Sequence, residues 1–98
     1  MTPFTKAVYD VVASIPKGKV FTYAHVAKLA GKAGAARAVG NALNKNTDFK
    51  TVPCHRVVRG NGKMGGYVKG TDKKIALLKK EGVIIDKERV RTSCIIDS

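Results

Sequence analysis

The sequence predicts a mainly α-helical domain with a winged helix-turn-helix-like order of elements and a short hairpin wing. Three observations lead to this prediction. Apolar residues recur at helical spacing in several segments, a short glycine-containing turn joins two of these segments, and a stretch with Asn-Gly turn chemistry follows them. The 98 residues, 44% of them apolar, suffice for one modest core, so we expect a single domain over residues 1–98.

The first two helices are predicted from apolar spacing and from the residues that start and stop helices. Apolar side chains at helical intervals indicate a helix over residues 4–15, and Pro16 lies just after its end. Thr22 is a suitable N-cap for a second helix over residues 23–30, because its hydroxyl can accept a hydrogen bond from a free backbone N–H.

A turn over residues 31–34 separates the second helix from a third, which we expect over residues 35–45. Two short helices joined by a turn of this length with glycine are typical of a helix-turn-helix unit.

The remaining elements are shorter. Residues 59–67 contain Asn-Gly turn chemistry and are expected to form a loose hairpin or wing. Thr71 is a candidate N-cap for a last helix over residues 72–81, and residues 83–85 are expected to be extended. Residues 86–98 are expected to form a charged C-terminal tail.

Charge is the first indication of function. The formal net charge is +12, and residues 1–80 alone have a net charge of +13. A basic domain of this density attracts polyanions, which favours a nucleic-acid partner. A lysine-rich solubility surface is the alternative interpretation.

The sequence does not indicate a membrane protein, a disulfide-rich protein or a metalloprotein. No apolar run reaches the roughly 20 residues that span a bilayer, so no membrane partner is expected. Two cysteines do not make a disulfide scaffold, and no spacing resembles a metal site. We expect a monomer without cofactor or metal, cytoplasmic, and associated with the nucleoid in a prokaryote or nuclear in a eukaryote.

The segment around Cys54 is the strongest candidate for chemistry. Cys54 stands next to His55 and close to two arginines, and positive surroundings favour the nucleophilic thiolate. The Cys54-His55 pair alone is weak evidence for a catalytic site, because neighbouring side chains in an extended segment point to opposite faces. A buried structural cysteine is the alternative.

An ordered set of motifs extends this interpretation. It consists of Ala36-Arg37-Ala38-Val39-Gly40, Asn46, Pro53-Cys54-His55-Arg56-Val57-Val58, Gly66-Tyr67, and Leu77-Leu78 before Glu81-Gly82. In order and spacing, these motifs resemble the alkyltransferase domain of the 6-O-alkylguanine-DNA alkyltransferases (methylated-DNA–protein-cysteine methyltransferases). The resemblance implies a DNA-binding domain that flips 6-O-alkylguanine out of double-stranded DNA and transfers the alkyl group irreversibly to its own cysteine, in a single turnover.

The resemblance also implies a role for each matching residue. Cys54 would accept the alkyl group, and His55 would act through a water as its base, oriented by Glu81. Asn46 would hold the active-site segment, and Tyr23 would donate a proton toward guanine N3 and press on the phosphate beside the extruded base.

Two further groups are implied. Arg37 would fill the space that the flipped base leaves in the duplex. The DNA-binding residues would be Arg37, Ala36, Tyr23, Gly34, Ala35 and Arg56. The substrate pocket would be formed by Tyr67, Val68, Val57, Gly65, Gly66 and Lys74.

Taken singly, several of these residues have other interpretations. Tyr23 is also consistent with a half-buried aromatic side chain of the core, and Glu81 with the last residue of a surface helix. Arg37 is also consistent with an ion pair, and Tyr67 with packing within the wing. The sequence also departs from the family at Val68 and Lys69, where small residues are common, and we expect these two to narrow the pocket.

Two other functions remain open. The first is a non-enzymatic lesion sensor, like the alkyltransferase-like proteins, which have tryptophan where this chain has Cys54. The second is a winged-helix transcription regulator that uses Arg37 for sequence readout.

Overall fold

The computed structural model describes residues 2–67 and 69–96, and its elements follow the predicted order. In chain order they are α1 (Pro3–Ala13), β1 (Val20–Thr22), α2 (Tyr23–Leu29), α3 (Ala36–Asn44), the 3-10 turn η1 (Cys54–Arg56), β2 (Val57–Val58), α4 (Thr71–Lys80), β3 (Ile85–Asp86), β4 (Arg89–Val90), the 3-10 turn η2 (Thr92–Cys94) and β5 (Ile95–Ile96). The mainly helical fold is therefore confirmed, with a small sheet in addition. Within these ranges no helix has the length and apolar character needed to cross a membrane.

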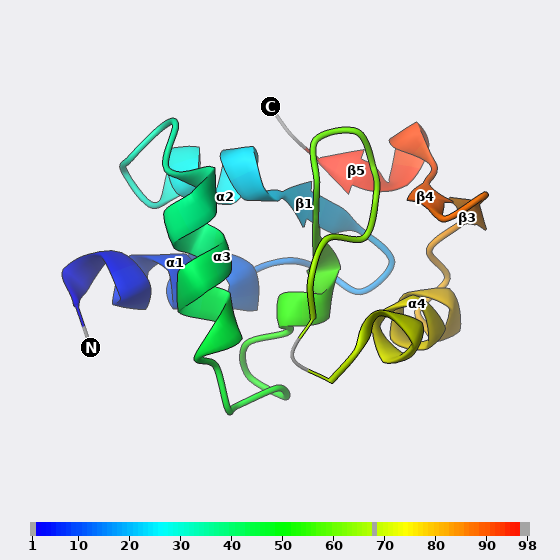
Figure 1. Ribbon diagram of the computed structural model, residues 1–98, viewed down its shortest axis with the longest axis horizontal. Helices are drawn as coiled ribbons and strands as arrows, with labels where there is room; N and C mark the ends of the chain where they lie inside the picture. Colours follow the sequence, from blue (N-terminus) through cyan, green and yellow to red (C-terminus); the bar gives the residue numbers. More distant parts are fainter. Residues whose placement is uncertain (1, 68, 97–98) are drawn as a thin grey trace.

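Helices α1, α2 and α3 pack together on one side of the molecule, and α4 lies on the other side with β3 and β4 (Figure 1). Val8 and Val12 of α1, Val26 of α2 and Val39 of α3 are fully buried in the core between the three helices. The apolar spacing that predicted these helices is thus the spacing of their buried faces.

The helix-turn-helix unit forms as predicted. The Thr22 hydroxyl accepts a hydrogen bond from the backbone N–H of His25 at 3.1 Å, which confirms Thr22 as the N-cap of α2. Gly31 and Gly34 turn the chain with φ of +95° and +88°, in a region that glycine adopts without strain. The turn places α3 against α2 with one face of α3 free of the core.

Strand β1 is central in a three-stranded parallel sheet with the order β2-β1-β5. Phe21 pairs with Val57 and Val20 pairs with Ile95. Because α2 begins directly after β1, and β2 begins directly after the Cys54 turn, the β1–β2 pairing fixes the start of α2 relative to Cys54.

One local prediction was wrong. Thr71 is the first residue of α4 rather than its cap; Gly70 precedes it with φ of +98°, and no side chain caps the helix. The predicted wing forms as a loose turn: the backbone N–H of Arg59 donates to the carbonyl of Lys63 at 2.9 Å, and residues 64–67 form no strand. Lys63 instead makes an antiparallel bridge to Arg89.

The segment expected to be a charged tail contains ordered structure. Its β4 pairs with β3, and its β5 pairs with β1. Val90 and Cys94 are buried in a second core cluster with Leu78 and Val83. Strands of two residues show no periodicity, so the sequence pattern did not indicate them.

Candidate active site

Cys54 lies in η1, between the loop that follows α3 and strand β2. Its backbone N–H donates to the carbonyl of Val52 at 2.8 Å, and the residue is only 6% exposed. The segment is a 3-10 turn rather than the extended piece assumed from the sequence. Successive side chains in a 3-10 turn point about 120° apart, so Cys54 and His55 face different surroundings.

His55, Arg56 and Glu81 form one buried hydrogen-bonded cluster. His55 Nε2 lies 3.0 Å from Glu81 Oε2. Arg56 donates to the same carboxylate through Nε at 2.9 Å and Nη2 at 2.7 Å, a bidentate geometry, and donates through Nη1 to the carbonyl of Ile15 at 2.8 Å. The sequence-predicted partnership of His55 and Glu81 is therefore present as a contact.

These contacts set the charge states of the cluster. Burial alone would raise the pKa of the Glu81 carboxyl, but hydrogen bonds from Arg56 and His55 hold it below its ordinary value. Burial lowers the pKa of His55 and outweighs the nearby Glu81, which acts to raise it. At neutral pH the cluster thus contains a carboxylate, a guanidinium and a neutral imidazole.

Arg56 was expected to bind DNA, and the structure contradicts this. All three nitrogens of its guanidinium donate to protein acceptors, and its side chain is largely buried. It serves instead to hold Glu81 and the end of α1 beside the Cys54 turn.

The expectation that positive surroundings favour the Cys54 thiolate was also wrong in its net effect. Burial raises the pKa of the Cys54 thiol, against the smaller lowering effects of Asn46 and Lys74. The resting thiol is therefore protonated at neutral pH.

Asn46 holds the segment that leads to Cys54. Its side-chain amide donates to the carbonyl of Val52 at 2.9 Å, and its side-chain oxygen accepts from the backbone N–H of Asp48 at 3.0 Å. Asn46 is buried, and its contact with the Val52 carbonyl is shielded from water. That it holds this segment for catalysis, as the resemblance implies, stays a prediction.

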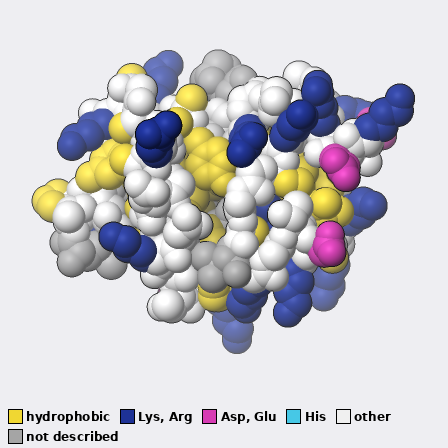
Figure 2. Space-filling model, in the orientation of Figure 1, with side chains coloured by type: hydrophobic (Ala, Val, Ile, Leu, Met, Phe, Trp, Pro, Cys, Tyr) yellow, Lys and Arg dark blue, Asp and Glu magenta, His cyan; other side chains and the backbone are white. Residues whose placement is uncertain are grey.

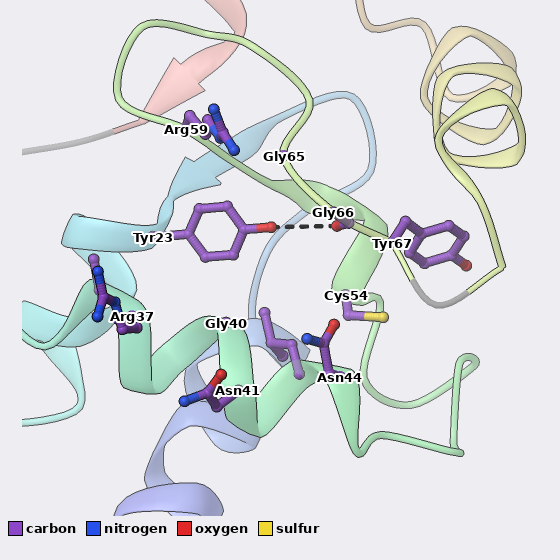
Figure 3. A pocket seen from close by; sticks show the side chains of 12 residues that line it. Tyr23, Arg37, Gly40, Asn41, Asn44, Cys54, Arg59, Gly65, Gly66 and Tyr67 are labelled. Atoms are coloured by element: carbon purple, nitrogen blue, oxygen red, sulfur yellow. Dashed lines mark hydrogen bonds between the residues drawn. The ribbon is translucent and has the colours of Figure 1, made fainter.

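Cys54 lies on the wall of a pocket of about 360 Å³ between α2, α3 and the glycine-rich loop, which comprises residues 60–66 (Figure 3). The pocket lining comprises Tyr23, Ala36, Arg37, Gly40, Asn41, Leu43, Asn44, Cys54, Arg59, Gly65, Gly66 and Tyr67. In Figure 3, Arg37 and Cys54 lie at opposite ends, with α3 between them. Seven of the predicted site residues therefore line one pocket: Tyr23, Ala36, Arg37, Cys54, Gly65, Gly66 and Tyr67.

Sequence reasoning missed the rest of the α3 wall. Gly40, Asn41 and Asn44 follow Ala36 and Arg37 at helical intervals on one face of α3. The sequence did contain a signal for this wall. Asparagine and glycine lie on the face of α3 opposite the buried Val39, so that face is free to contact a ligand.

Tyr23 and the glycine-rich loop form the opposite wall. The Tyr23 hydroxyl donates to the carbonyl of Gly66 at 3.4 Å. Gly65 has φ of +68°, and a Cβ there would lie 3.0 Å from the Tyr23 ring, so glycine is required for this close approach. Burial raises the pKa of the Tyr23 hydroxyl, which is therefore a neutral donor at physiological pH.

Lys74 and Val57 were expected to line the pocket, and neither does. Val57 is fully buried in β2 within the core. Lys74 is also fully buried; its ammonium donates to the carbonyls of Met64 and Gly66, and burial lowers its pKa to about 8. Lys74 thus supports the glycine-rich loop from behind.

The remaining predicted residues lie near the mouth or outside the described ranges. Gly34 and Ala35 lie in the turn that leads into α3, beside Arg37 but outside the pocket lining. Val68 lies outside the described residues. Lysine and arginine side chains are spread over the face that Figure 2 shows, around a hollow lined by apolar side chains, and acidic side chains lie at one edge of this view.

Comparison with known proteins places this site in a family. The family profile described as "6-O-methylguanine DNA methyltransferase, DNA binding domain" matches residues 3–83. The methylated-DNA–protein-cysteine methyltransferase of Methanosarcina acetivorans is 48% identical over 81 residues, which are 83% of this chain and 52% of the relative. The chain thus spans about half the length of the curated relatives it matches.

Solved structures give the same result. A Mycobacterium tuberculosis structure described as OGT in complex with DNA has a TM-score of 0.80 and 42% identity, covering 83% of this chain and 50% of that one. The S. pombe Atl1 structure, in complex with damaged DNA containing O6-carboxymethylguanine, has a TM-score of 0.78 and 35% identity, covering 88% of this chain and 82% of that one. With its Cys54 pocket and the match over residues 3–83, the chain belongs to the 6-O-methylguanine DNA methyltransferase family, whose DNA-binding domain it contains.

Proposed function

We propose that this protein binds double-stranded DNA containing 6-O-alkylguanine and transfers the alkyl group to the sulfur of its own Cys54. The observation that supports this most directly is the position of Cys54 on the wall of a pocket that Tyr23 also lines and that has Arg37 at its far end. The net charge of +12 supports a polyanionic partner.

The first step is extrusion of the base. The alkylated O6 of guanine lies inside the base stack, so the nucleotide must flip before sulfur reaches it. Arg37 is exposed on α3 at the end of the pocket away from Cys54. Its side chain fills the gap in the stack and offsets part of the cost of unstacking.

The second step is activation of the thiol. Cys54 is protonated at rest, so its proton passes through a water to the neutral imidazole of His55. Among the described residues, the hydrogen bonds of the His55 ring involve only Nε2, which leaves Nδ1 for that water. Glu81 stabilises the imidazolium as it forms, and Arg56 keeps Glu81 in place.

The third step is group transfer. The sulfur attacks the alkyl carbon, the bond between that carbon and guanine O6 breaks, and the electron pair goes to the purine. The Tyr23 hydroxyl donates a proton toward guanine N3 as charge develops on the base, and it recovers a proton from the imidazolium through solvent. The products are unmodified guanine and an S-alkyl cysteine, a thioether that does not release its alkyl group at neutral pH, so each molecule reacts once.

Intact-protein mass spectrometry after exposure to DNA containing 6-O-methylguanine tests this function. We expect a gain of one methyl group, about 14 Da, on Cys54 and no second gain on repeat exposure. Cys94→Ser should be modified like the wild type, and Cys54→Ser should stay unmodified while still binding the DNA. Methylation of Cys94 in place of Cys54, or of neither cysteine, would show the proposal to be wrong.

The similarity to S. pombe Atl1 favours a second candidate, a lesion-binding protein without transfer. The same experiment separates the two. Binding to methylated DNA in preference to unmodified DNA, with Cys54 unmodified, would support lesion sensing alone.

A further inference from the structure

Lys69 contacts an aromatic ring of the loop that precedes Cys54. Its ammonium lies 4.2 Å from the centroid of the Phe49 ring, a cation–π geometry. Phe49 belongs to the loop between α3 and Cys54, and Lys69 belongs to the segment between the glycine-rich loop and α4. The contact therefore joins a segment that precedes Cys54 to one that follows it.

Phe49 also supports a wall of the pocket. The rings of Phe49 and Tyr67 meet edge to face, with centroids 6.2 Å apart and an interplanar angle of 75°. Tyr67 in turn meets the His55 ring at 6.5 Å and 74°. Tyr67 lines the pocket together with Cys54, and its ring packs against the rings of both His55 and Phe49.

We propose that Lys69 and Phe49 form a cation–π clasp that restrains Tyr67, a wall of the Cys54 pocket, and thereby restricts transfer to small alkyl groups. The proposal rests on the proposed function and names the specificity of that same site. A methyl group needs no displacement of the wall, whereas a benzyl group needs Tyr67 to move back. Tyr67 packs against Phe49, so displacing Tyr67 disturbs Phe49, which Lys69 holds.

The size of the effect follows from the exposure of the clasp. Lys69 is exposed and Phe49 is half-buried. An exposed cation–π contact changes the balance between a closed and an open arrangement by about two- to fivefold. We therefore expect the clasp to slow the transfer of large alkyl groups rather than to prevent it.

The chain offers a matched control. Lys32 lies over the Phe4 ring at 5.3 Å, and neither residue lines the Cys54 pocket. Lys32→Ala removes a lysine–phenylalanine contact and one positive charge, as Lys69→Ala does. Lys69→Arg keeps a cation available to the Phe49 ring.

The test compares single-turnover rates for 6-O-methylguanine and 6-O-benzylguanine placed in the same duplex. The ratio of the two rates cancels effects on DNA binding and on the thiol, which both substrates share. We expect Lys69→Ala and Phe49→Leu each to raise the benzyl-to-methyl ratio by about two- to fivefold, and the double variant to raise it no further than Phe49→Leu does. Lys69→Arg and Lys32→Ala should leave the ratio at its wild-type value.

The outcomes separate this inference from the function on which it rests. If the wild type transfers no methyl group to Cys54, the proposed function is wrong. If methyl transfer occurs but Lys69→Ala leaves the ratio unchanged, or Lys32→Ala raises it equally, the function stands and the clasp is overturned.

Discussion

The carboxylate of Glu81 lies 3.0 Å from Nε2 of His55, across 26 residues of chain. The same carboxylate accepts two hydrogen bonds from Arg56. Its two oxygens thus contact the two residues that follow Cys54, and the geometry of the Cys54 turn depends on a residue at the end of α4.

The first prediction concerns this pair. His55→Ala and Glu81→Gln should slow methyl transfer by about 100-fold, the usual contribution of general-base catalysis, and change the affinity for methylated DNA much less. Glu88→Gln, at an exposed site, is the charge-matched control. Single-turnover kinetics and a DNA-binding titration measure the two effects. A transfer rate within about twofold of wild type in either variant would remove His55 and Glu81 from the mechanism.

The second prediction is the pH dependence of transfer. Burial lowers the pKa of His55, so the imidazole remains an effective base at pH values below its ordinary pKa of 6.5. The rate should therefore fall only at more acidic pH. Burial lowers the pKa of Lys74 to about 8, so above that pH the carbonyls of Met64 and Gly66 lose a charged donor and the rate should fall again.

A pH–rate profile measured on the intact protein tests this expectation. Lys74→Met should flatten the fall above pH 8 while leaving the acidic limb in place. A profile in Lys74→Met that still falls above pH 8 would assign the alkaline limb to another group.

The third prediction concerns Arg37. Arg37→Ala should slow transfer from duplex DNA more than from single-stranded DNA, because an unpaired strand has less stacking to replace. Lys45→Ala removes an equal charge just beyond the other end of α3, outside the pocket lining, and should affect both substrates alike. An equal loss on both substrates in Arg37→Ala would mean that Arg37 binds phosphate only.

The fourth prediction is a stability difference between two adjacent glycines. Gly65→Ala forces a side chain into a backbone with φ of +68° and places Cβ 3.0 Å from the Tyr23 ring. We expect a loss of about 1–3 kcal/mol in the free energy of unfolding. Gly66→Ala, where an added Cβ meets nothing within 4 Å, should lose less. Urea unfolding of both variants measures the difference, and equal losses would contradict the close packing of Tyr23 on Gly65.

The fifth prediction concerns the Arg56–Glu81 ion pair. Arg56→Met leaves a largely buried carboxylate without its main partner and should reduce stability by about 2–3 kcal/mol at neutral pH. The folded-state pKa of Glu81 is lowered, so its stabilising contribution is present above its ordinary pKa of 4.5 and is lost as pH falls below it. The stability difference between wild type and Arg56→Met should therefore narrow below about pH 4.5. A difference that is constant from pH 7 to pH 3 would contradict the pairing.

Much of the helical fold was predictable because the information is local. Val8 and Val12 follow the period of α1, and Thr22 caps α2 through a residue three positions away. The last two strands were not predictable in this way. Ile95 pairs with Val20 across most of the chain, and two residues are too few to show a strand pattern.

In the candidate site, too, some features were predictable from the sequence and others were not. The family resemblance implied roles for Cys54, His55, Glu81 and Asn46. The structure places His55 against Glu81, and Asn46 against the segment that precedes Cys54. The sequence pattern misjudged Arg56, because an arginine beside a reactive cysteine can face DNA or a buried acid. The position of Glu81 at the end of α4 decides between these two environments, and Arg56 faces the buried acid.

The hydrogen bonds of Arg56 reach Ile15 at the end of α1 and Glu81 at the end of α4. These contacts are distant in sequence, and distant contacts form late in folding, after the local helices α1, α2 and α3. During synthesis on the ribosome, Cys54 is made well before Glu81. Under the proposed mechanism, the nascent chain therefore contains Cys54 without its base-orienting partner, and the thiol becomes reactive only when α4 docks.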